Sequence, residues 1–408
     1  MALGAARAVL LKLGSPAAKA GAGGGVASAF WTFPAVLGSA VVIAWGAEAA
    51  QFLVSQGLAL AILAWLQTLP EFAVEAVIAL EAGRDPAKIH LATANFTGSL
   101  RLLVGLGWPM IYAVAAIAHR RRGRGPLREI VLDGGNAVEV VGLLPCLLYF
   151  CYVLFKGSLT VWDSLWLSLI YLVYLWLLNR MPPEEEEAAE DIPAVPRAIL
   201  RQRPRVRNAC IVGLFVLGGA ALFVAAHPFL ESMLAMAVVL GISQYVFIQW
   251  IAPFLSEFPE YVSALKWSAH KRAPMALMNM ISSNINQWTV LAAMIPLCYS
   301  YAKGAATPLM LDAAQESEIG LTLAQSFLGF VLLANMRFAW HEALALFLLW
   351  GAQFAVADIR REVAVVYLAW SVVLLASVAV RRRSLECLPA FRALWRAHVL
   401  QRPEGTPR

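Results

Sequence analysis

Two proline–glutamate pairs stand inside apolar stretches of this sequence, and their residue types indicate a definite chemistry. The first is Pro70-Glu71 in LQTLPEFAVEAVIAL, and the second is Pro259-Glu260 in FLSEFPEYVSAL. Proline removes a backbone donor and frees carbonyl oxygens in the preceding helical turn. A carboxylate placed there in a membrane is costly unless it is paired, protonated or bound to a cation. Carboxylates with loose carbonyls form a hard oxygen site, which suits Ca²⁺ or Na⁺ better than a soft metal.

Two further glutamates lie near these pairs. Glu75 follows Glu71 by one helical turn, and Glu257 precedes Glu260 on the same helix face. Both are candidates for extra ligands or proton carriers, because several carboxylates crowded at low dielectric cannot all stay ionised. The alternative is that Arg101, which stands within an apolar stretch, pairs with one of them.

The elements that must position these residues are predicted to be membrane-spanning helices. Of the 408 residues, 60% are hydrophobic and 14% are charged, whereas soluble domains carry about 25% charged residues. The apolar spacing is helical, unlike the alternation of a membrane barrel. About eleven stretches approach the roughly 20 residues needed to cross a bilayer. They lie near residues 33–54, 57–80, 89–118, 131–155, 162–179, 209–228, 233–265, 274–301, 319–338, 340–357 and 363–380.

Positive charge is concentrated in alternate loops between these stretches. Arginines cluster at 120–128, 180–207 and 381–383 within a chain of net charge +6. With the N-terminus outside, these loops all fall on one side, which the positive-inside rule identifies as cytoplasmic. The basic charge therefore needs no nucleic-acid partner. The five cysteines are interpreted as small buried hydrophobes and not as a disulfide framework.

The chain divides into two similar halves. Acidic and basic runs with prolines, from Asn179 to Asn208, are typical of a linker. Each half holds a Pro-Glu helix break followed by a helix with small polar residues. The second predicted span corresponds to the seventh, so equivalent spans cross in opposite directions, and such repeats place a substrate site at mid-membrane. We therefore predict an all-α polytopic membrane protein with inverted five-plus-five transmembrane repeats and one extra C-terminal helix.

The predicted domain organisation follows from this division. Residues 1–30 are predicted to form a flexible N-terminal tail, 31–179 the first repeat and 180–208 a cytoplasmic linker. Residues 209–357 are predicted to form the second repeat, and 358–408 an extra span with a cytoplasmic tail.

In these motifs the sequence resembles the sodium/calcium exchanger family of the cation/Ca²⁺ exchanger superfamily. That family carries two α-repeats, each with a Gly-Thr-Ser-x-Pro-Glu-like motif on one helix and a Gly-Asn-x-x-Gly-Ser-Asn-x-x-Asn-like motif on the next. The counterparts here are LQTLPE with ANFTGSLRLL, and FLSEFPE with NMISSNINQ. The resemblance covers roughly residues 34–357.

The resemblance implies that Glu71 and Glu260 coordinate the transported cation. It also implies ligands at the other matching positions, which are Thr68, Ser99, Ser256, Ser283, Asn284 and Gln287.

The sequence departs from the family pattern in both repeats. Gln67 occupies a hydroxyl position of the first repeat, and Glu257 occupies one of the second. Leu100 and Leu103 stand where the family has asparagine, which removes oxygen ligands from the usual Na⁺ sites. Gln67, Glu75 and Glu257 are therefore candidates for coupling to a second ion.

The predicted function is secondary active antiport of a hard cation, foremost Ca²⁺, against Na⁺ or H⁺ by alternating access. No covalent chemistry and no cofactor are expected, so the protein is not interpreted as an enzyme. Its expected partners are inorganic cations and the lipid bilayer, and its expected location is the plasma (inner) membrane. A proton-coupled exchanger is the alternative within this class. A degenerate relative that senses cations or has a structural role is the alternative of another class.

Overall fold

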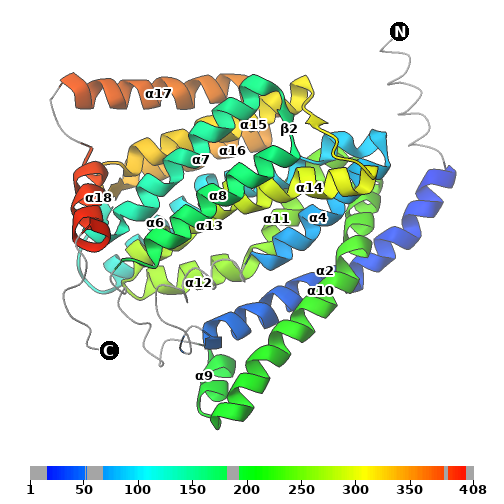
Figure 1. Cartoon of the computed structure of the whole chain (residues 1–408), viewed down its shortest axis with the longest axis horizontal. Coiled ribbons are helices and arrows are strands. Elements are labelled where there is room, and N and C mark those ends of the chain that lie inside the picture. Colours follow the sequence, from blue (N-terminus) through cyan, green and yellow to red (C-terminus); the bar gives the residue numbers. More distant parts are fainter. Residues whose placement is uncertain (1–15, 51, 53–67, 182–192, 381–384, 401–408) are drawn as a thin grey trace.

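The protein is a bundle of long helices, seen here in a computed structural model that describes residues 16–50, 52, 68–181, 193–380 and 385–400 (Figure 1). The helices of the first half are α2 (Pro16–Ala50), α4 (Leu69–Arg84), η2 (Pro86–Leu91), α5 (Ala94–Leu102), η3 (Leu103–Gly107), α6 (Trp108–Arg121), η4 (Gly134–Asn136), α7 (Ala137–Lys156) and α8 (Val161–Leu178).

The helices of the second half follow, with further helices at its end. They are α9 (Ala194–Leu200), α10 (Pro204–Leu240), α11 (Gln244–Ser256), α12 (Phe258–Ala269), α13 (Ala273–Asn286), η5 (Gln287–Leu291), α14 (Ala292–Lys303), α15 (Ala313–Leu333), α16 (Trp340–Ala355), η6 (Ala357–Ile359), α17 (Arg360–Val380), α18 (Cys387–Trp395) and η7 (Arg396–Leu400). Within the described residues, six helices are long and apolar enough to cross a membrane by length and composition. The predicted class of fold is confirmed.

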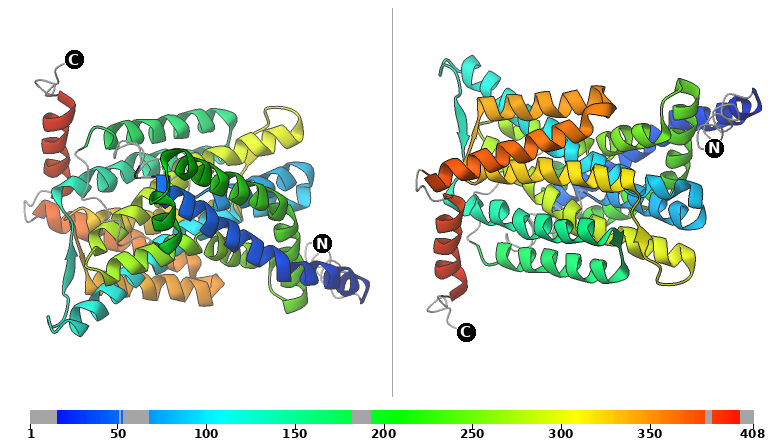
Figure 2. Two further views of the ribbon diagram at one scale, coloured as in Figure 1. Left: turned by 90° about the horizontal axis from the view of Figure 1, so that it is seen from below. Right: turned by 90° about the horizontal axis from the view of Figure 1, so that it is seen from above.

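Helices α2 and α10 pack against one another on one flank of the bundle, as both views in Figure 2 show. The Thr32 and Ser28 hydroxyls lie 3.1 and 2.8 Å from Ser232 Oγ, so polar contacts join the two helices. Gly218 permits the close approach, because a Cβ there would lie 2.7 Å from Ile43 Cγ1. Small and hydroxyl residues are the usual means by which helices associate within a bilayer.

Both Pro-Glu pairs lie at the beginning of a helix. Pro259 follows the boundary between α11 and α12, where Glu257 is the last residue before the new helix. Pro70 stands in the first turn of α4, where a missing backbone N–H is tolerated. The prediction that each proline interrupts a span is therefore confirmed at α11–α12; the residues just before α4, Gln67 included, lie outside the described residues.

The two Pro-Glu helices run in opposite directions. Helix α4 ends beside α14, where a Cβ on Gly83 would lie 2.6 Å from Ala302. Helix α12 ends at the other end of the bundle, where Arg122 donates a 2.7 Å hydrogen bond to the Ala269 carbonyl. Figure 1 shows the two helices starting near the middle of the bundle and diverging. Opposed directions are the arrangement that inverted repeats require.

The helices that follow the Pro-Glu pairs share an irregular turn. A π-helical turn begins four residues after Ser99, at Leu103, and another begins four residues after Ser283, at Gln287. Such π turns occur frequently at functional sites. Helix α5 also crosses α11 very closely, since a Cβ on Gly98 would lie 1.7 Å from the Gln249 carbonyl oxygen. This crossing brings Ser99 to the break between α11 and α12.

Two short antiparallel sheets join the loops at the two ends of the bundle. At one end β1 (Glu129–Val131) pairs with β4 (Arg337–Ala339), and at the other β2 (Ser158–Leu159) pairs with β3 (Leu309–Met310). The arginine-rich loop of residues 120–128 belongs to the first end, together with α18, since the Cys387 N–H donates a 3.0 Å hydrogen bond to the Ala334 carbonyl.

Some predicted boundaries are wrong. Residues 16–30, expected in a flexible tail, belong to α2, and residues 194–200 of the expected linker form α9. The sixth span does not end at Pro228 but continues to Leu240, where Gly241 adopts a φ of 69° and ends α10. Glycine reaches this left-handed conformation without steric penalty. The predicted extra span is α17, which packs against α15.

Candidate cation-binding site

Glu71 and Glu260 lie in the first turns of α4 and α12, respectively. Both side chains are buried, with 1% and 4% of their surface exposed. The positive end of a helix dipole stabilises a carboxylate in this position. On the opposite side of the second break, α11 ends, and Pro259 deprives the Leu255 carbonyl of its usual helical partner. The two buried carboxylates therefore each lie at a helix start, and the second lies directly after the break between α11 and α12.

Gln287 joins the two halves of the chain at this point. Its side-chain Nε2 donates hydrogen bonds to Glu71 Oε2 at 2.9 Å and to Glu257 Oε1 at 2.7 Å. Glu71 belongs to the first repeat and Glu257 to the second. Gln287 is the first residue of the π turn η5, which is the local irregularity that presents its amide to both carboxylates.

Ser99 donates a short hydrogen bond to Glu257 Oε1, the oxygen that Gln287 also contacts. The Tyr261 hydroxyl donates to the other oxygen of Glu257 at 3.3 Å. Glu257 is 3% exposed, so its carboxylate is surrounded by donors and not by water. The sequence predicts only an auxiliary role for this residue, whereas the structure links it to Glu71 across the repeats through Gln287.

Glu260 has its own donors within the second repeat. Ser283 Oγ donates to Glu260 Oε1 at 2.5 Å, and Asn279 Nδ2 donates to the same oxygen at 3.2 Å. The carboxylates of Glu71, Glu257 and Glu260 are close enough to repel one another. At low dielectric this repulsion is relieved by a bound cation or by protons.

Glu75 is fully buried one turn further along α4. Asn95 Nδ2 donates to Glu75 Oε2 at 2.8 Å, while its Oε1 has no hydrogen-bond partner among the described residues. Glu75 therefore adjoins the three-carboxylate group without sharing its donors.

The remaining predicted ligands differ in the hydrogen bonds that their side chains form. Thr68 Oγ1 accepts a 2.6 Å hydrogen bond from Asn286, which again joins the two repeats. The Asn284 amide is fully buried and lacks a hydrogen-bond partner in the described part of the chain. Ser256 donates at 3.0 Å to the Ala252 carbonyl of its own helix, so its hydroxyl proton is directed away from the carboxylates. The expectation for Gln67 concerns a residue outside the described ranges.

Arg101 pairs with neither Glu75 nor Glu257. Its guanidinium lies 2.6 Å from Glu318 Oε2 of α15 and donates to Gln353 of α16 at 2.9 Å. Arg360, at the start of α17, contacts the other oxygen of Glu318. The pairing of Arg101 with Glu75 or Glu257, which the sequence suggested, is therefore wrong. Arg101 does not neutralise either carboxylate.

Sequence reasoning missed three amides of this region: Asn95, Asn279 and Asn286. Asn95 and Asn279 stand in matching positions, each four residues before the serine of its repeat. That correspondence was available in the sequence, since one helical turn separates each asparagine from Ser99 or Ser283. Asn286 has an apolar counterpart, Leu102, so no repeat signal marked it.

The arrangement supplies oxygens and exchangeable protons. Ca²⁺ takes six to eight oxygen ligands, and this region of the bundle contains the carboxylates of Glu71, Glu257 and Glu260, the hydroxyls of Ser99 and Ser283 and the Gln287 amide. In the part of the chain that is described, no group of three His, Cys, Asp or Glu side chains converges tightly enough to hold a metal ion. The hydrogen bonds of Gln287 and Ser99 occupy carboxylate oxygens, so a cation must replace these donors when it binds.

Opposed half-repeats, an interrupted helix and buried carboxylates at mid-bundle define a multi-pass secondary transporter of cations. The family model described as "Sodium/calcium exchanger protein" matches residues 25–179 and 210–357. The chain therefore belongs to the sodium/calcium exchanger family, as the motifs indicated.

Solved structures agree with this assignment. The crystal structure of the H⁺/Ca²⁺ exchanger CAX is similar with a TM-score of 0.84 and 32% sequence identity, over 92% of each chain. The sodium-calcium exchanger NCX_Mj soaked with 10 mM Na⁺ and 10 mM Sr²⁺ is similar with a TM-score of 0.52 and 18% identity, over 81% of this chain and 97% of that chain. The second likeness concerns the fold alone. The comparison with curated proteins returned no match.

Proposed function

We propose that the protein is a Ca²⁺/H⁺ antiporter in which Glu71, Glu257 and Glu260 bind either one Ca²⁺ or protons. The observation that carries this proposal is the shared donor: Gln287 contacts Glu71 and Glu257 at 2.9 and 2.7 Å. Because the two carboxylates come from opposed repeats, a cation between them would couple the movements of both repeats.

The oxygen set suits Ca²⁺. The three carboxylates, the hydroxyls of Ser99 and Ser283 and the amide oxygen of Gln287 supply enough ligands for its usual coordination. Gln287 Oε1 and Glu71 Oε1 have no hydrogen-bond partner among the described residues, so both are available for a cation. A flexible set of oxygens favours Ca²⁺ over Mg²⁺, which demands strict octahedral geometry.

Protons are the proposed counter-ion because the carboxylates repel one another when the cation leaves. Several carboxylates buried in one region at low dielectric cannot all remain ionised, and Arg101 is engaged by Glu318 at 2.6 Å. Protons therefore bind as Ca²⁺ leaves and are released as it returns. Mutually exclusive occupancy of one site, combined with alternating access, is sufficient for antiport.

The first repeat is poorly suited to Na⁺. Leu100 and Leu103, which match Asn284 and Gln287 of the second repeat, are fully buried in the hydrophobic core. They supply no side-chain oxygen, so a set of separate Na⁺ sites lacks ligands on this side. The 32% identity with an H⁺/Ca²⁺ exchanger supports the same choice.

The test is Ca²⁺ flux in proteoliposomes with one ion gradient imposed at a time. We expect a pH gradient alone to drive ⁴⁵Ca²⁺ uptake, and a Na⁺ gradient alone to drive little. Glu71→Gln and Glu260→Gln should each lower this flux at least about tenfold, because each removes a charge-assisted ligand. Glu362→Gln, at an exposed position of α17, is the matched control and should transport normally.

Two outcomes would contradict the proposal. Flux that requires Na⁺ and ignores the pH gradient would identify a Na⁺-coupled exchanger. Ca²⁺ binding without flux under any gradient would favour a cation sensor. Fractionation of the host cell tests the expected plasma (inner) membrane location.

A further inference from the structure

Helix α18 lies across one end of the bundle, in contrast to the spanning helices. Figures 1 and 2 show its axis running roughly at right angles to α17. It is fixed in place by Cys387, which is fully buried and donates its backbone N–H to the Ala334 carbonyl at 3.0 Å, and by packing against α7. A helix held at this angle lies in the plane of the membrane surface, where amphipathic helices bind lipid.

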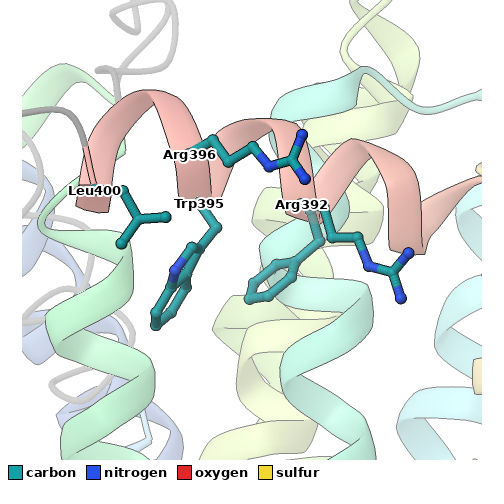
Figure 3. A pocket seen from close by; sticks show the side chains of 5 residues that line it. Arg392, Trp395, Arg396 and Leu400 are labelled. Atoms are coloured by element: carbon teal, nitrogen blue, oxygen red, sulfur yellow. The ribbon is translucent and has the colours of Figure 1, made fainter.

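One face of α18 and η7 forms an open hollow of about 330 Å³. It is lined by Phe391, Arg392, Trp395, Arg396 and Leu400, and Figure 3 shows the Trp395 indole below the helix with the Arg392 and Arg396 side chains extending away from it along the helix. Arg392 and Arg396 are exposed, and neither forms an ion pair with a carboxylate among the described residues. The hollow therefore combines an apolar floor with two unneutralised positive charges.

A third arginine, Arg180, lies just after the end of α8, next to a tryptophan that contacts α18. The Trp395 ring contacts Trp176 edge to face, with centroids 6.3 Å apart, and the Arg180 guanidinium lies 5.0 Å from the centre of the Trp176 ring. Tryptophan pairs of this kind favour the boundary between hydrocarbon and head groups. Arg180 thus adds a third positive charge next to the pair of indoles that joins α8 to α18.

An exposed apolar stripe continues from this position along α8. Leu165, Leu169, Leu172 and Trp176 follow helical spacing on one face and are 58%, 45%, 60% and 43% exposed. The stripe is about 16 Å long at 1.5 Å per residue, which is about half of a hydrocarbon core of roughly 30 Å. Its length corresponds to one acyl chain in one leaflet.

We propose that this surface, formed by α18, η7 and the outer face of α8, is a binding site for one anionic phospholipid. Arg180, Arg392 and Arg396 bind the phosphate group, the two tryptophans contact the glycerol region, and an acyl chain lies along the α8 stripe. The three unpaired arginines select an anionic head group over a zwitterionic one, because basic residues near the surface attract anionic lipid. The site is separate from the carboxylates at mid-bundle.

The test uses the purified full-length protein with defined lipids. Native mass spectrometry should show retained phosphatidylglycerol but not retained phosphatidylcholine, and added phosphatidylglycerol should raise the Tm. The double variant Arg392→Gln, Arg396→Gln should bind phosphatidylglycerol about 30-fold more weakly. The conservative double variant Arg392→Lys, Arg396→Lys should keep most of the binding, since it keeps the charge.

The matched control is Arg120→Gln, Arg121→Gln, which removes two exposed arginines from the same end of the bundle and should retain the lipid. All variants must elute as one species and melt cooperatively, which separates loss of the site from loss of the fold. Equal binding by the Arg392→Gln, Arg396→Gln variant and the native chain would overturn the proposal. Equal protection by phosphatidylcholine, by inorganic phosphate alone or by a polyglutamate peptide would overturn it as well.

Discussion

Glu71 and Glu257 belong to opposite halves of the chain, and one side-chain nitrogen, Gln287 Nε2, donates to both of them. This contact joins the first turn of α4 to the break between α11 and α12. When either carboxylate binds a proton or a cation, its hydrogen bond to the Gln287 amide changes. The same amide contacts the carboxylate of the other repeat, so the change affects both repeats.

The first prediction follows from this shared donor. Gln287→Leu introduces the residue that the first repeat has at the matching position, Leu103, and keeps a similar volume. It leaves Glu71 and Glu257 without their common partner and removes an amide oxygen, so we expect Ca²⁺ affinity to fall at least about tenfold. Isothermal titration with Ca²⁺ measures this. Unchanged affinity would show that the amide does not belong to the site.

The second prediction separates two serines that the family resemblance treats alike. Ser99 donates to Glu257 across the repeats, whereas Ser256 donates to Ala252 of its own helix. We expect Ser99→Ala to lower Ca²⁺ flux several-fold and Ser256→Ala to change it less than twofold. Parallel uptake assays on the two variants provide the comparison, and the reverse order of effects would contradict it.

The third prediction concerns proton coupling. Glu257 is buried between Ser99 and Gln287, so it is a suitable proton carrier in the Ca²⁺-free state. Glu257→Gln mimics the protonated carboxyl and cannot release a proton. We expect it to reduce flux driven by a pH gradient more than it reduces equilibrium Ca²⁺ binding. A parallel loss of both quantities would show that Glu257 acts as a ligand alone.

The fourth prediction addresses the buried charges around α15. Glu318→Gln leaves Arg101 and Arg360 with no carboxylate, and breaking a buried pair from one side costs about 3–5 kcal/mol. The exposed pair of Arg337 and Glu129, at 2.6 Å, is the control, since surface pairs contribute about 0–1 kcal/mol. We expect Glu318→Gln to lower the Tm in detergent clearly and Glu129→Gln to leave it nearly unchanged. Equal shifts would indicate that the buried pair has no special role.

The sequence could predict those structural features that are caused by residues close together in the chain, and not those that depend on distant packing. A Pro-Glu pair interrupts a span because of the proline itself, so the break between α11 and α12 followed from the residues. The partner of Arg101 did not, because Glu318 is distant in the chain and meets it through the packing of α15. The bridging role of Gln287 depends on a π turn that no residue type signals. The span predicted near residues 209–228 instead continues through Pro228 to Leu240, because a proline within a bilayer helix is tolerated where neighbouring groups satisfy the freed backbone.

The last prediction is the orientation in the membrane. At the end of the bundle that contains β2 and β3, Lys156 pairs with Asp163, and Arg84 and Lys88 pair with Glu81 at 3.4 and 2.8 Å. The opposite end carries the exposed arginines 120, 121, 122 and 124. Because unneutralised positive charge stays in the cytoplasm, we expect this end to be cytoplasmic.

Cysteine labelling tests the orientation in a background without the native cysteines. Lys303→Cys lies at the exposed end of α14, and Arg121→Cys lies at the exposed end of α6. A membrane-impermeant maleimide should label Lys303→Cys in intact cells and Arg121→Cys only after the cells are opened. The opposite pattern would invert the topology and would place the α18 lipid site in the outer leaflet. Labelling of both positions in intact cells would mean that neither end is protected, and the comparison must then be repeated in sealed vesicles of known orientation.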